Sequence, residues 1–298
     1  MIAVEFAWLA SMKISTKTPR LVESCDEIRE AVGHARLAGE TIGVVPTMGA
    51  LHEGHLSLVR TAREDCTFNV TTIFVNPAQF GPNEDLAQYP RTFEADLDAL
   101  AQYDVDLVFL PSVEEMYPDG FSTFVDPPDV ASPLEGQCRP GHFRGVATVV
   151  LKLLTAVPAD RAYFGEKDYQ QLLVIRKMVA DLNLPVTVCP CPIVREVDGL
   201  ALSSRNTYLS GEERQQGLAL SRSLRVADEL VQSGERNANM VRSAMRHELD
   251  EAGVMEVDYI AIADMDTLHP VELIDRPCRA LVAARVGQTR LIDNCQIG

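Results

Sequence analysis

The sequence predicts an α/β protein: a Rossmann-like, doubly wound parallel sheet, followed by a smaller α+β part at the C-terminus. From residue 42 to residue 194, short β-branched runs alternate with helical patterns. Strand–helix–strand order of this kind produces a parallel sheet with helices on both faces. After residue 194 the pattern changes to long helical stretches followed by apolar runs. No repeat, low-complexity tract or coiled-coil heptad is present.

The expected strands are short runs rich in Val, Ile and aromatic residues. They are 42–45, 69–75, 105–110, 161–164 and 186–194. The helices expected between them are 55–65, 92–103, 145–157 and 168–182. Leu97, Leu100 and Ala101 illustrate the spacing that buries one face of a helix. Ligands of such sheets bind at the carboxyl ends of the strands, so the turns after these strands are the places to search for a site.

In the C-terminal part, Ser210 and Glu213 have the spacing of a capping box and predict a long helix that ends near residue 232. The elements expected after it are a helix at 238–251 and apolar runs at 256–264 and 280–293, the last with a hairpin turn at Gly287-Gln288. We therefore expect two domains, 1–193 and 194–298. Residues 1–18 are expected to be a loosely held extension.

The composition limits the classes of partner. The chain has 43 acidic and 27 basic residues and a net charge of −16. Nucleic acid and anionic membranes require a basic face, so neither is expected as a partner. The apolar start is interrupted by Glu5 and has no preceding basic region, and no stretch is long enough to span a membrane. The seven scattered cysteines lack the spacing of a redox or zinc pair, which favours free thiols in the cytoplasm.

The stretch PTMGALHEGHLSL, at 46–58, joins an expected strand to an expected helix. Glycines allow close approach of the backbone, and the first amides of a helix are free donors at the positive end of its dipole. The position therefore favours a phosphate group, to which His52 and His55 can donate hydrogen bonds. A metal site would need a third ligand that no nearby cluster supplies. Histidines that only cap backbone groups are the other alternative.

Neutral amides and surface charges follow the next strand. FVNPAQF, at 74–80, contains Asn76 and Gln79, which can both donate and accept and so suit a hydroxylated or carboxylate-bearing small molecule. A structural role in the turn is the alternative. In YPRTFEAD, Arg91 and Asp96 are mostly explained as surface charges at the start of a helix.

Two more stretches offer cations. FGEKDYQQL, at 164–172, has Gly165 in a turn after a strand, Lys167 as a point cation and Asp168 as an acceptor; Gln171 lies one helical turn beyond Lys167. LSSRN, at 202–206, places two hydroxyls and an arginine on a loop that can close over a polyphosphate. A solvated lysine and an ordinary polar loop are the alternatives.

A last stretch, at 136–154, places Arg139, His142 and Arg144 ahead of an apolar helix. These side chains either line the entrance of a site for an acidic substrate, or cap the helix and lie on the surface of a loop. The residues alone leave the two alternatives open.

Together these stretches resemble the pantothenate synthetase (pantoate–β-alanine ligase) family. The resemblance rests on PTMGALHEGHLSL, FVNPAQF, YPRT, RPGHFRGV, FGEKDYQQL and VREVDGLALSSRN, in order, from about Gly43 to the closing hairpin. HEGH stands in the place of the motif that names the HIGH nucleotidyltransferase superfamily, and LSSR resembles its mobile second signature. Leu202 stands where the family commonly has Met, a mild change in shape.

The resemblance implies a two-step reaction. ATP and (R)-pantoate give pantoyl adenylate and pyrophosphate, with Mg²⁺ assisting. The amine of β-alanine then attacks the activated carbonyl, which releases AMP and pantothenate. The resemblance also implies a homodimer. Mg²⁺ is expected mainly on phosphate oxygens and water, with Asp96 a minor candidate for a protein contact.

The resemblance further implies roles for individual residues. The catalytic residues would be His55, as a proton donor, with His52, Lys167, Ser203, Ser204 and Arg205. The ATP contacts would be Met48, Gly49, Ala50, Leu51, His52, Glu53, Gly54, His55, Gly165, Glu166, Lys167, Asp168, Val194, Leu202, Ser203, Ser204 and Arg205. Pantoate would contact Gln79 and Gln171, with Gln79 also near β-alanine.

Three other functions remain as alternatives. Another adenylyltransferase of the HIGH superfamily would keep the adenylyl group on its product instead of releasing AMP. A nicotinamide-dependent oxidoreductase is disfavoured because the first strand-turn lacks G-x-G-x-x-G. A nucleotide sensor without catalytic activity would bind ATP without forming an adenylate.

Overall fold

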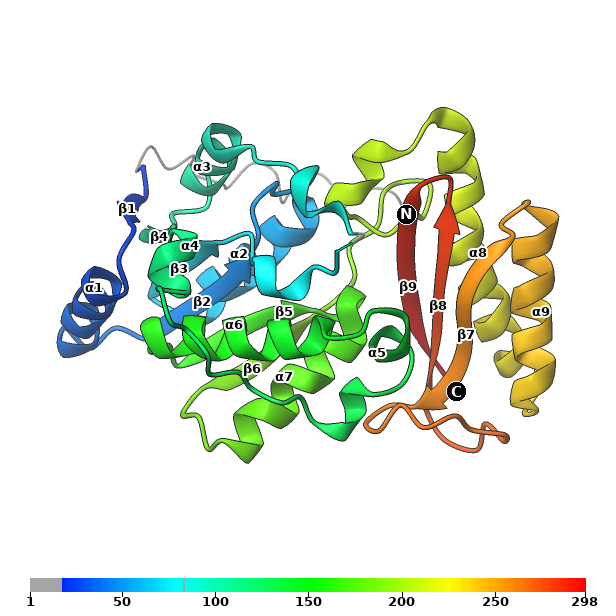
Figure 1. Cartoon of the computed structure of the whole chain (residues 1–298). Helices are drawn as coiled ribbons and strands as arrows, with labels where there is room; N and C mark the ends of the chain where they lie inside the picture. The colour runs from blue at the N-terminus through cyan, green and yellow to red at the C-terminus, as the bar shows by residue number, and fades with distance from the viewer. Residues whose placement is uncertain (1–17, 83) are drawn as a thin grey trace, which may run out of the picture.

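The computed structural model describes residues 18–82 and 84–298, which form two sheets with helices packed around them (Figure 1). The expected extension at 1–18 lies outside the described residues except for its last position. Across the described ranges, no helix is long and apolar enough to cross a membrane.

The larger sheet has six parallel strands in the order β1-β4-β3-β2-β5-β6. They are β1 (Arg20–Val22), β2 (Ile42–Thr47), β3 (Phe68–Ile73), β4 (Leu107–Phe109), β5 (Arg161–Gly165) and β6 (Thr187–Cys191). The prediction of a doubly wound parallel sheet is confirmed. β6 is an edge strand, which accommodates Pro190. It ends before the expected limit at 194, and residues 192–194 line a cavity instead.

Helices cover both faces of this sheet. They are α1 (Cys25–Leu37), α2 (Glu53–Asp65), α3 (Phe93–Ala101), α4 (Val113–Met116), α5 (Glu135–Cys138), α6 (His142–Ala156) and α7 (Tyr169–Asp181). Val44 shares a core with residues of α1, α6 and α7, while its neighbour Val45 shares another with residues of α2 and α3. Adjacent residues of a strand point to opposite faces, so β2 carries both cores.

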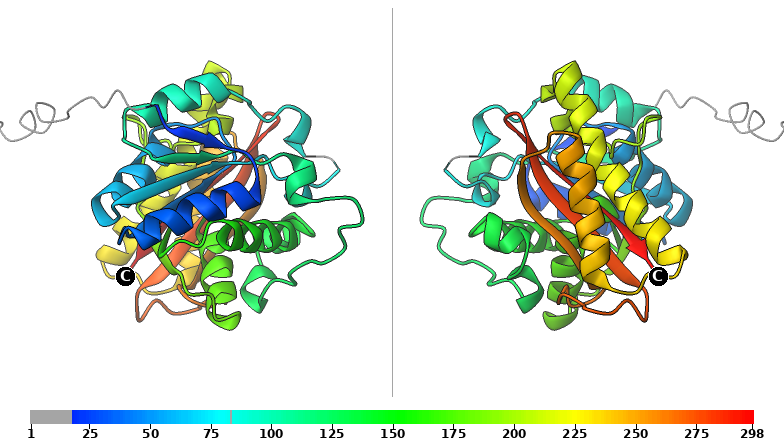
Figure 2. Two further views of the ribbon diagram at one scale, coloured as in Figure 1. Left: turned by 90° about the vertical axis from the view of Figure 1, so that its left-hand side faces the viewer. Right: turned by 90° about the vertical axis from the view of Figure 1, so that its right-hand side faces the viewer.

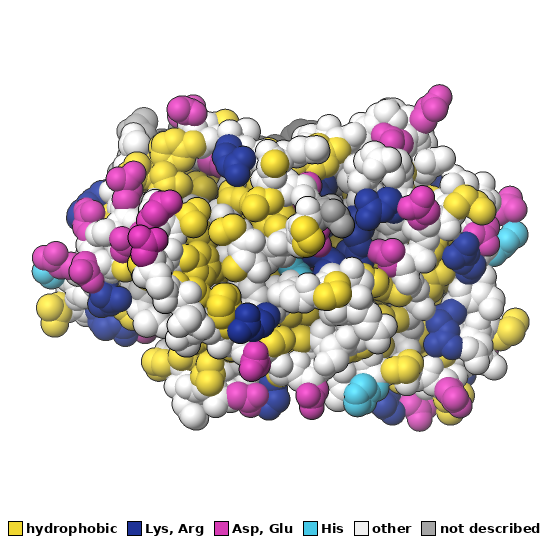
Figure 3. Space-filling view, in the orientation of Figure 1, with side chains coloured by type: hydrophobic (Ala, Val, Ile, Leu, Met, Phe, Trp, Pro, Cys, Tyr) yellow, Lys and Arg dark blue, Asp and Glu magenta, His cyan; other side chains and the backbone are white. Residues whose placement is uncertain are grey.

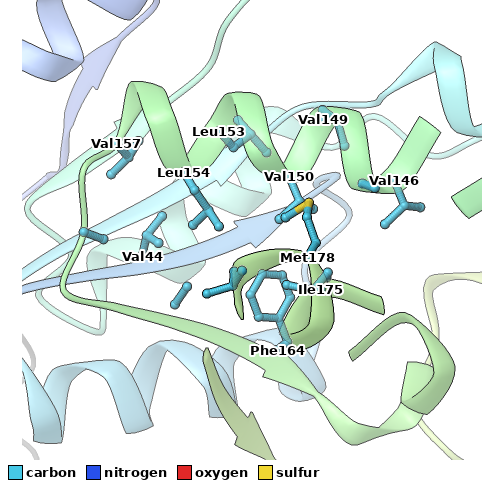
Figure 4. Packing of buried hydrophobic residues seen from close by; sticks show 14 of the residues in the cluster. Val44, Val146, Val149, Val150, Leu153, Leu154, Val157, Phe164, Ile175 and Met178 are labelled. Carbon is cyan, nitrogen blue, oxygen red and sulfur yellow. The ribbon is translucent and has the colours of Figure 1, made fainter. Parts of the chain in front are cut away.

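Helix α6 is the most buried of the helices beside the site. Eleven of its fifteen residues are buried. Val150, Leu153 and Leu154 are buried, and Figure 4 shows α6 side chains packed toward Val44 of β2 and Met178 of α7. Burying each of these side chains contributes roughly 1.5–3 kcal/mol. The helix begins three residues before its expected start, directly after Gly141, whose φ is 85°.

The smaller sheet is antiparallel, in the order β7-β8-β9, and two long helices cover it. Its elements are α8 (Gly211–Gln232), α9 (Ala238–Glu251), β7 (Glu256–Asp264), β8 (Cys278–Val286) and β9 (Thr289–Ile297). Figure 2 shows α8 and α9 across the outer side of this sheet. The capping box of Ser210 and Glu213 is present, and the hairpin turns at Gly287-Gln288, as predicted.

The two sheets share part of one hydrophobic core. Ala263, Leu268 and Leu281, which belong to or adjoin the smaller sheet, lie in the same buried cluster as the apolar residues of α6 and α7. The remaining apolar residues of the C-terminal part form a cluster of their own between the sheet and α8 and α9. A domain division near residue 193 stays a prediction.

Candidate active site

The candidate site is a cavity of about 220 Å³ at the carboxyl edge of the larger sheet. It lies where strand order reverses, because β2 and β5 are neighbours although the chain forms β3 and β4 between them. The segments after β2, β3, β5 and β6 line it, together with residues 202–205. Basic side chains and a histidine are visible in a hollow near the middle of the molecule (Figure 3).

A larger cavity, of about 900 Å³, adjoins the first and extends to β9 of the smaller sheet. The residues common to both cavities are Arg139, Lys167, Asp168, Ser203 and Arg205. The two spaces therefore form one cleft, and charged side chains stand where they meet.

Most of the residues expected at the site line the smaller cavity. They are Met48, His52, Gly54, His55, Gln79, Gly165, Lys167, Asp168, Gln171, Val194, Leu202, Ser203, Ser204 and Arg205. The structure places the others outside its lining: Gly49, Ala50, Leu51, Glu53, Glu166 and Asp96. Segments far apart in the sequence thus meet at one place.

Asp96 of α3 anchors the loop that follows β2. Its carboxylate accepts hydrogen bonds from the amides of Ala50 and Leu51, both at 2.9 Å, and from Thr92 Oγ1 at 3.0 Å. Gly49 and Ala50 have φ of 79° and 51°, and the anchor stabilises this left-handed turn. Asp96 is buried and its oxygens are occupied, so its contacts are those of a loop anchor. No group of three or more His, Cys, Asp or Glu among the described residues could hold a metal ion.

His52 and His55 stand at the start of α2, with their ring centroids 4.1 Å apart. His52 is the N-cap, and its Nδ1 accepts a hydrogen bond from the amide of Gly54 at 3.1 Å. An accepting Nδ1 carries no proton, so the proton of the neutral ring is on Nε2. His52 can therefore donate a hydrogen bond without being charged.

Both histidine rings are neutral near pH 7. Burial, followed by the charge of Lys167, lowers the pKa of His52 to about 4. Burial, followed by the neighbouring His52, lowers the pKa of His55 to about 3. The buried Nδ1 of His55 has no hydrogen-bond partner among the described residues. An anion bound beside the two rings would raise both pKa values, because negative charge favours the protonated form.

Lys167 lies in the short turn Glu166–Asp168 (η4), between β5 and α7. Its Nζ is 3.8 Å from Asp168 Oδ2, and its side chain, 21% exposed, lines the cavity. The space beside Gly165 is open, since an added Cβ would meet only the Lys167 amide, at 4.0 Å. Glu166 instead forms an ion pair with Arg279 of β8, at 3.2 Å.

Residues 203–205 are held by a segment that precedes α3. Arg205 forms a bidentate ion pair with Asp85, at 2.8 and 2.9 Å. Ser204 Oγ lies 3.3 Å from the hydroxyl of Tyr89. The guanidinium of Arg205 is thus already paired, and an anion that binds it must compete with Asp85. We call His52, His55, Lys167 and Arg205 the basic set.

Three carboxamides also line the cavity, and we call Asn76, Gln79 and Gln171 the amide set. Asn76 is fully buried; its Oδ1 accepts from the hydroxyl of Tyr117 at 2.7 Å, and its Nδ2 donates to Gln79 Oε1 at 3.0 Å. The Nε2 of Gln79 therefore points away from Asn76 and lies 3.1 Å from Met48 Sδ. Hydrogen bonds fix the amide orientation of Gln79 before any ligand binds.

Arg139 and His142 belong to the site, whereas Arg144 does not. Arg139 forms a bidentate pair with Glu84, at 2.6 and 2.8 Å, and its Nη1 lies 3.0 Å from His142 Nε2. His142 Nδ1 donates to the carbonyl of Gln79 at 2.9 Å, so Nε2 is its acceptor. Burial, followed by Arg139, lowers the pKa of His142 to about 4. Arg144 instead stacks on the ring of Phe124, at 3.9 Å.

The sequence interpretation missed the apolar wall of the cavity. Four apolar residues of α6 form this wall: Val146, Val149, Val150 and Leu153. Their helical spacing resembles ordinary core packing, and no local signal separates the two roles. Gly145, a glycine inside an expected helix, indicated only that this helix lies close to another segment: a Cβ there would lie 2.1 Å from the carbonyl oxygen of Ala78. The glycine lets α6 approach the turn that carries Gln79.

The described residues match known proteins over almost their whole length. A sequence model of the family described as Pantoate-beta-alanine ligase matches residues 20–296. The Pantothenate synthetase of Roseiflexus sp. (strain RS-1) is 55% identical over 276 residues, which cover 93% of this chain and 98% of that protein. The Pantothenate synthetase of Thermotoga neapolitana is 54% identical, over 94% of this chain and all of that protein (100%).

Solved structures have the same architecture. The crystal structure of pantothenate synthetase from Thermus thermophilus is 48% identical, with a TM-score of 0.88 over 93% of this chain and 98% of that one. The pantoate-beta-alanine ligase from Francisella tularensis, crystallised with beta-gamma ATP and beta-alanine, is 34% identical, with a TM-score of 0.77 over 93% of this chain and 97% of that one. With this fold, this cleft and these relatives, the chain belongs to the pantoate–β-alanine ligase family.

Proposed function

We propose that the cleft joins (R)-pantoate to β-alanine with ATP and forms pantothenate through a pantoyl-adenylate intermediate. The observation that supports this most directly is that the basic set and the amide set line one cavity at the switch point of the sheet. A reaction between a polyphosphate and an organic acid requires both kinds of group within reach of each other. The family to which the chain belongs carries out this ligation.

In this proposal the basic set binds the triphosphate. Lys167 and Arg205 supply positive charge, while His52 and His55 donate hydrogen bonds as neutral rings. The remaining contacts follow from the segments that line the cleft. We assign to ATP the residues after β2 that line the cavity, with Gly165, Lys167, Asp168, Val194 and the loop 202–205. The amides of Ala50 and Leu51 are left out because they already donate to Asp96.

The amide set and the α6 wall bind pantoate. (R)-Pantoate has a carboxylate, two hydroxyls and two methyl groups on one carbon, so its recognition needs both polar and apolar contacts. Gln79 Nε2 and Gln171 would hold the oxygens, with Gln79 also near β-alanine, and Val150 and Leu153 would face the methyl groups. Neutral amides suit this task because they can donate to a carboxylate and still accept from a hydroxyl.

The chemistry follows from this arrangement. A carboxylate oxygen of pantoate attacks the α-phosphorus of ATP, and the bond to pyrophosphate breaks. The amine of β-alanine then attacks the acyl carbon, loses a proton, and displaces AMP. Lys167 offsets charge that develops on the phosphate oxygens, which is the kind of contact that typically contributes about two to three orders of magnitude in rate.

Mg²⁺ fits this site as a companion of the nucleotide. Asp96 is occupied by three donors, and the described residues contain no cluster able to hold an ion alone. Phosphate oxygens and water would therefore supply most of its ligands. The ion would offset phosphate charge there.

We further propose a cytoplasmic homodimer. All seven cysteines are free thiols in the structure, which suits a reducing compartment. The dimer is inferred from the family resemblance, and sedimentation of the purified protein measures it directly. A monomer at working concentration would contradict it.

Analysis of the products separates this function from another adenylyltransferase of the superfamily. Incubation with ATP, (R)-pantoate and β-alanine is expected to yield AMP, pyrophosphate and pantothenate in equal amounts. A product that retains the adenylyl group after β-alanine is added would contradict the proposal and support the alternative. Mass spectrometry of the reaction mixture distinguishes the two outcomes.

A further inference from the structure

Asn294 of β9 holds the turn that carries Lys167. Its Nδ2 donates hydrogen bonds to the carbonyls of Glu166, at 3.0 Å, and Lys167, at 2.9 Å. Its Oδ1 accepts from Nε of Arg279 at 2.7 Å, and the residue is 3% exposed. Carbonyls only accept and a guanidinium only donates, so these partners determine the orientation of the amide. An aspartate at this position would have the same size but would place acceptor against acceptor.

Arg279 of β8 also holds this turn, and we call the contacts that Asn294 and Arg279 make with the turn the clamp. Its side chain is buried, its Nη2 forms an ion pair with Glu166 at 3.2 Å, and its guanidinium lies 4.0 Å from the ring centroid of Tyr169. Side chains of the smaller sheet therefore contact two carbonyls of the turn and the side chain of Glu166. The side chain of Lys167 takes no part in the clamp and lines the cavity.

The residue next to Asn294 holds the other cationic segment. Asp293 forms a bidentate ion pair with Arg195, at 2.6 and 2.9 Å, and its side chain is almost fully buried. Arg195 also donates to the carbonyl of Gly199 at 3.1 Å and is bridged to Ala201, so it sets the shape of the loop that leads to Ser203–Arg205. Two successive residues of β9 thus hold the turn that carries Lys167 and the loop that carries Arg205.

We infer that Asn294 is a positioning residue for adenylate formation, acting through Lys167; this inference rests on the proposed function of Lys167. Asn294 fixes the backbone from which the lysine extends, and so sets where the amine lies relative to the phosphates. A displacement of about 1 Å at a reacting centre can cost about 100-fold in rate. The smaller sheet therefore takes part in the first chemical step, although the sequence motifs indicated only residues 194 and 202–205 of the C-terminal part.

The test compares Asn294→Ala with a matched control on the same sheet. Tyr259→Phe removes a buried hydrogen bond, at 2.8 Å, from β7 to Glu135 and keeps the ring, and neither partner of this bond belongs to the turn Glu166–Asp168. Pantoate-dependent exchange of labelled pyrophosphate into ATP should fall about 100-fold in Asn294→Ala. The loss should appear in kcat, with the KM for pantoate changed less than about threefold. Tyr259→Phe should keep the wild-type exchange rate.

A double-mutant cycle separates positioning from general damage. If Asn294 acts through Lys167, the variant Asn294→Ala/Lys167→Ala should be no slower than Lys167→Ala alone. Hydrogen exchange at the peptide covering residues 165–170 should be faster in Asn294→Ala and unchanged in Tyr259→Phe. If Asn294→Ala fails to fold, the same measurements on Asn294→Ser apply, because a serine hydroxyl cannot reach both carbonyls.

Each contrary result has a distinct meaning. Exchange activity of Asn294→Ala within about threefold of wild type, or losses that multiply in the double variant, would overturn the inference. Unchanged hydrogen exchange at 165–170 would overturn it as well. If the wild-type protein shows no pantoate-dependent exchange, the proposed function fails, while hydrogen exchange still decides whether Asn294 holds the turn.

Discussion

The basic set and the amide set line the same cavity but are held in different ways. Asn76 and Gln79 are oriented by hydrogen bonds that leave a donor of Gln79 directed away from Asn76. Arg205 is instead neutralised by Asp85, and the neighbouring Arg139 by Glu84. Asn76 and Gln79 are therefore oriented before a ligand binds, whereas part of the basic set must exchange one anion for another.

This difference follows from the charge of the groups. Buried amides need only hydrogen-bond partners, which the fold supplies at little electrostatic cost. Cations gathered in a cleft repel each other and are costly to desolvate, so nearby carboxylates and neutral histidines keep the basic set stable without ATP. Changes that affect one set and leave the other intact therefore test the difference.

The largest expected effect comes from Lys167→Ala. Exchange of pyrophosphate into ATP should fall about 100- to 1,000-fold, because a cation that stabilises charge in the transition state is lost. The matched control is Lys177→Ala on α7, which removes an exposed pair with Asp181 and should leave the rate unchanged. A Lys167→Ala protein that is folded by circular dichroism and turns over normally would remove Lys167 from the mechanism.

Gln79→Glu tests the amide set with an almost isosteric change. A carboxylate facing the carboxylate of pantoate should raise the KM for pantoate about 100-fold, since like charges in contact cost several kcal/mol. The KM for ATP should change little. Gln102→Glu adds the same charge at an exposed position and serves as the control. Equal increases in both KM values would show that the two sets do not bind separate ligands.

Acid should destabilise the protein through the histidines of the basic set. The pKa of His52 is lowered to about 4 and that of His55 to about 3, so the folded protein does not protonate them at pH 5.5. The unfolded chain does protonate them, because the pKa of a free histidine is about 6.5. The unfolding free energy should therefore decrease by about 1 kcal/mol for each ring when the pH is lowered from 7.5 to 5.5. Stability falls as pH falls in this window, where most carboxylates are still ionised.

Urea unfolding at the two pH values measures this effect. His55→Gln should show a smaller loss on acidification than the wild type, because one titrating ring is absent. An unfolding free energy that stays constant or rises toward pH 5.5 would mean that the rings are protonated in the folded protein.

The smallest effect is expected for Asp85→Asn. Removing the carboxylate frees Arg205, so the KM for ATP should fall about three- to tenfold while the KM for pantoate stays constant. Asp26→Asn, which breaks an exposed pair with Arg29, is the control. A higher KM for ATP would show that Asp85 orients Arg205 for the nucleotide instead of competing with it.

Much of the fold could be predicted because its signals are local. The strands from β2 to β6 are short apolar runs, and the start of α8 follows from Ser210 and Glu213. β1 was missed because three residues are too few to show a period. α1 was missed although Ser24 caps it and Ile28, Val32 and Ala35 have helical spacing, so this signal was available.

The candidate site was also predicted only where its signals are local. The turns after the strands were predicted because the carboxyl ends of parallel strands must meet at one edge of a sheet. The roles of Asp85 and Asn294 were not predicted. Each contacts a residue more than a hundred positions away, and the sequence around it does not indicate a partner. Contacts of this kind appear only when the chain is folded.

We propose that one cleft binds ATP and an organic acid so that they react. The decisive experiment is incubation with ATP, Mg²⁺, (R)-pantoate and labelled pyrophosphate, without β-alanine. We predict that label enters ATP only when pantoate is present, because the adenylate forms and reverses in the absence of the amine. Formation of pantothenate without any such exchange, or exchange that ignores pantoate, would contradict the claim.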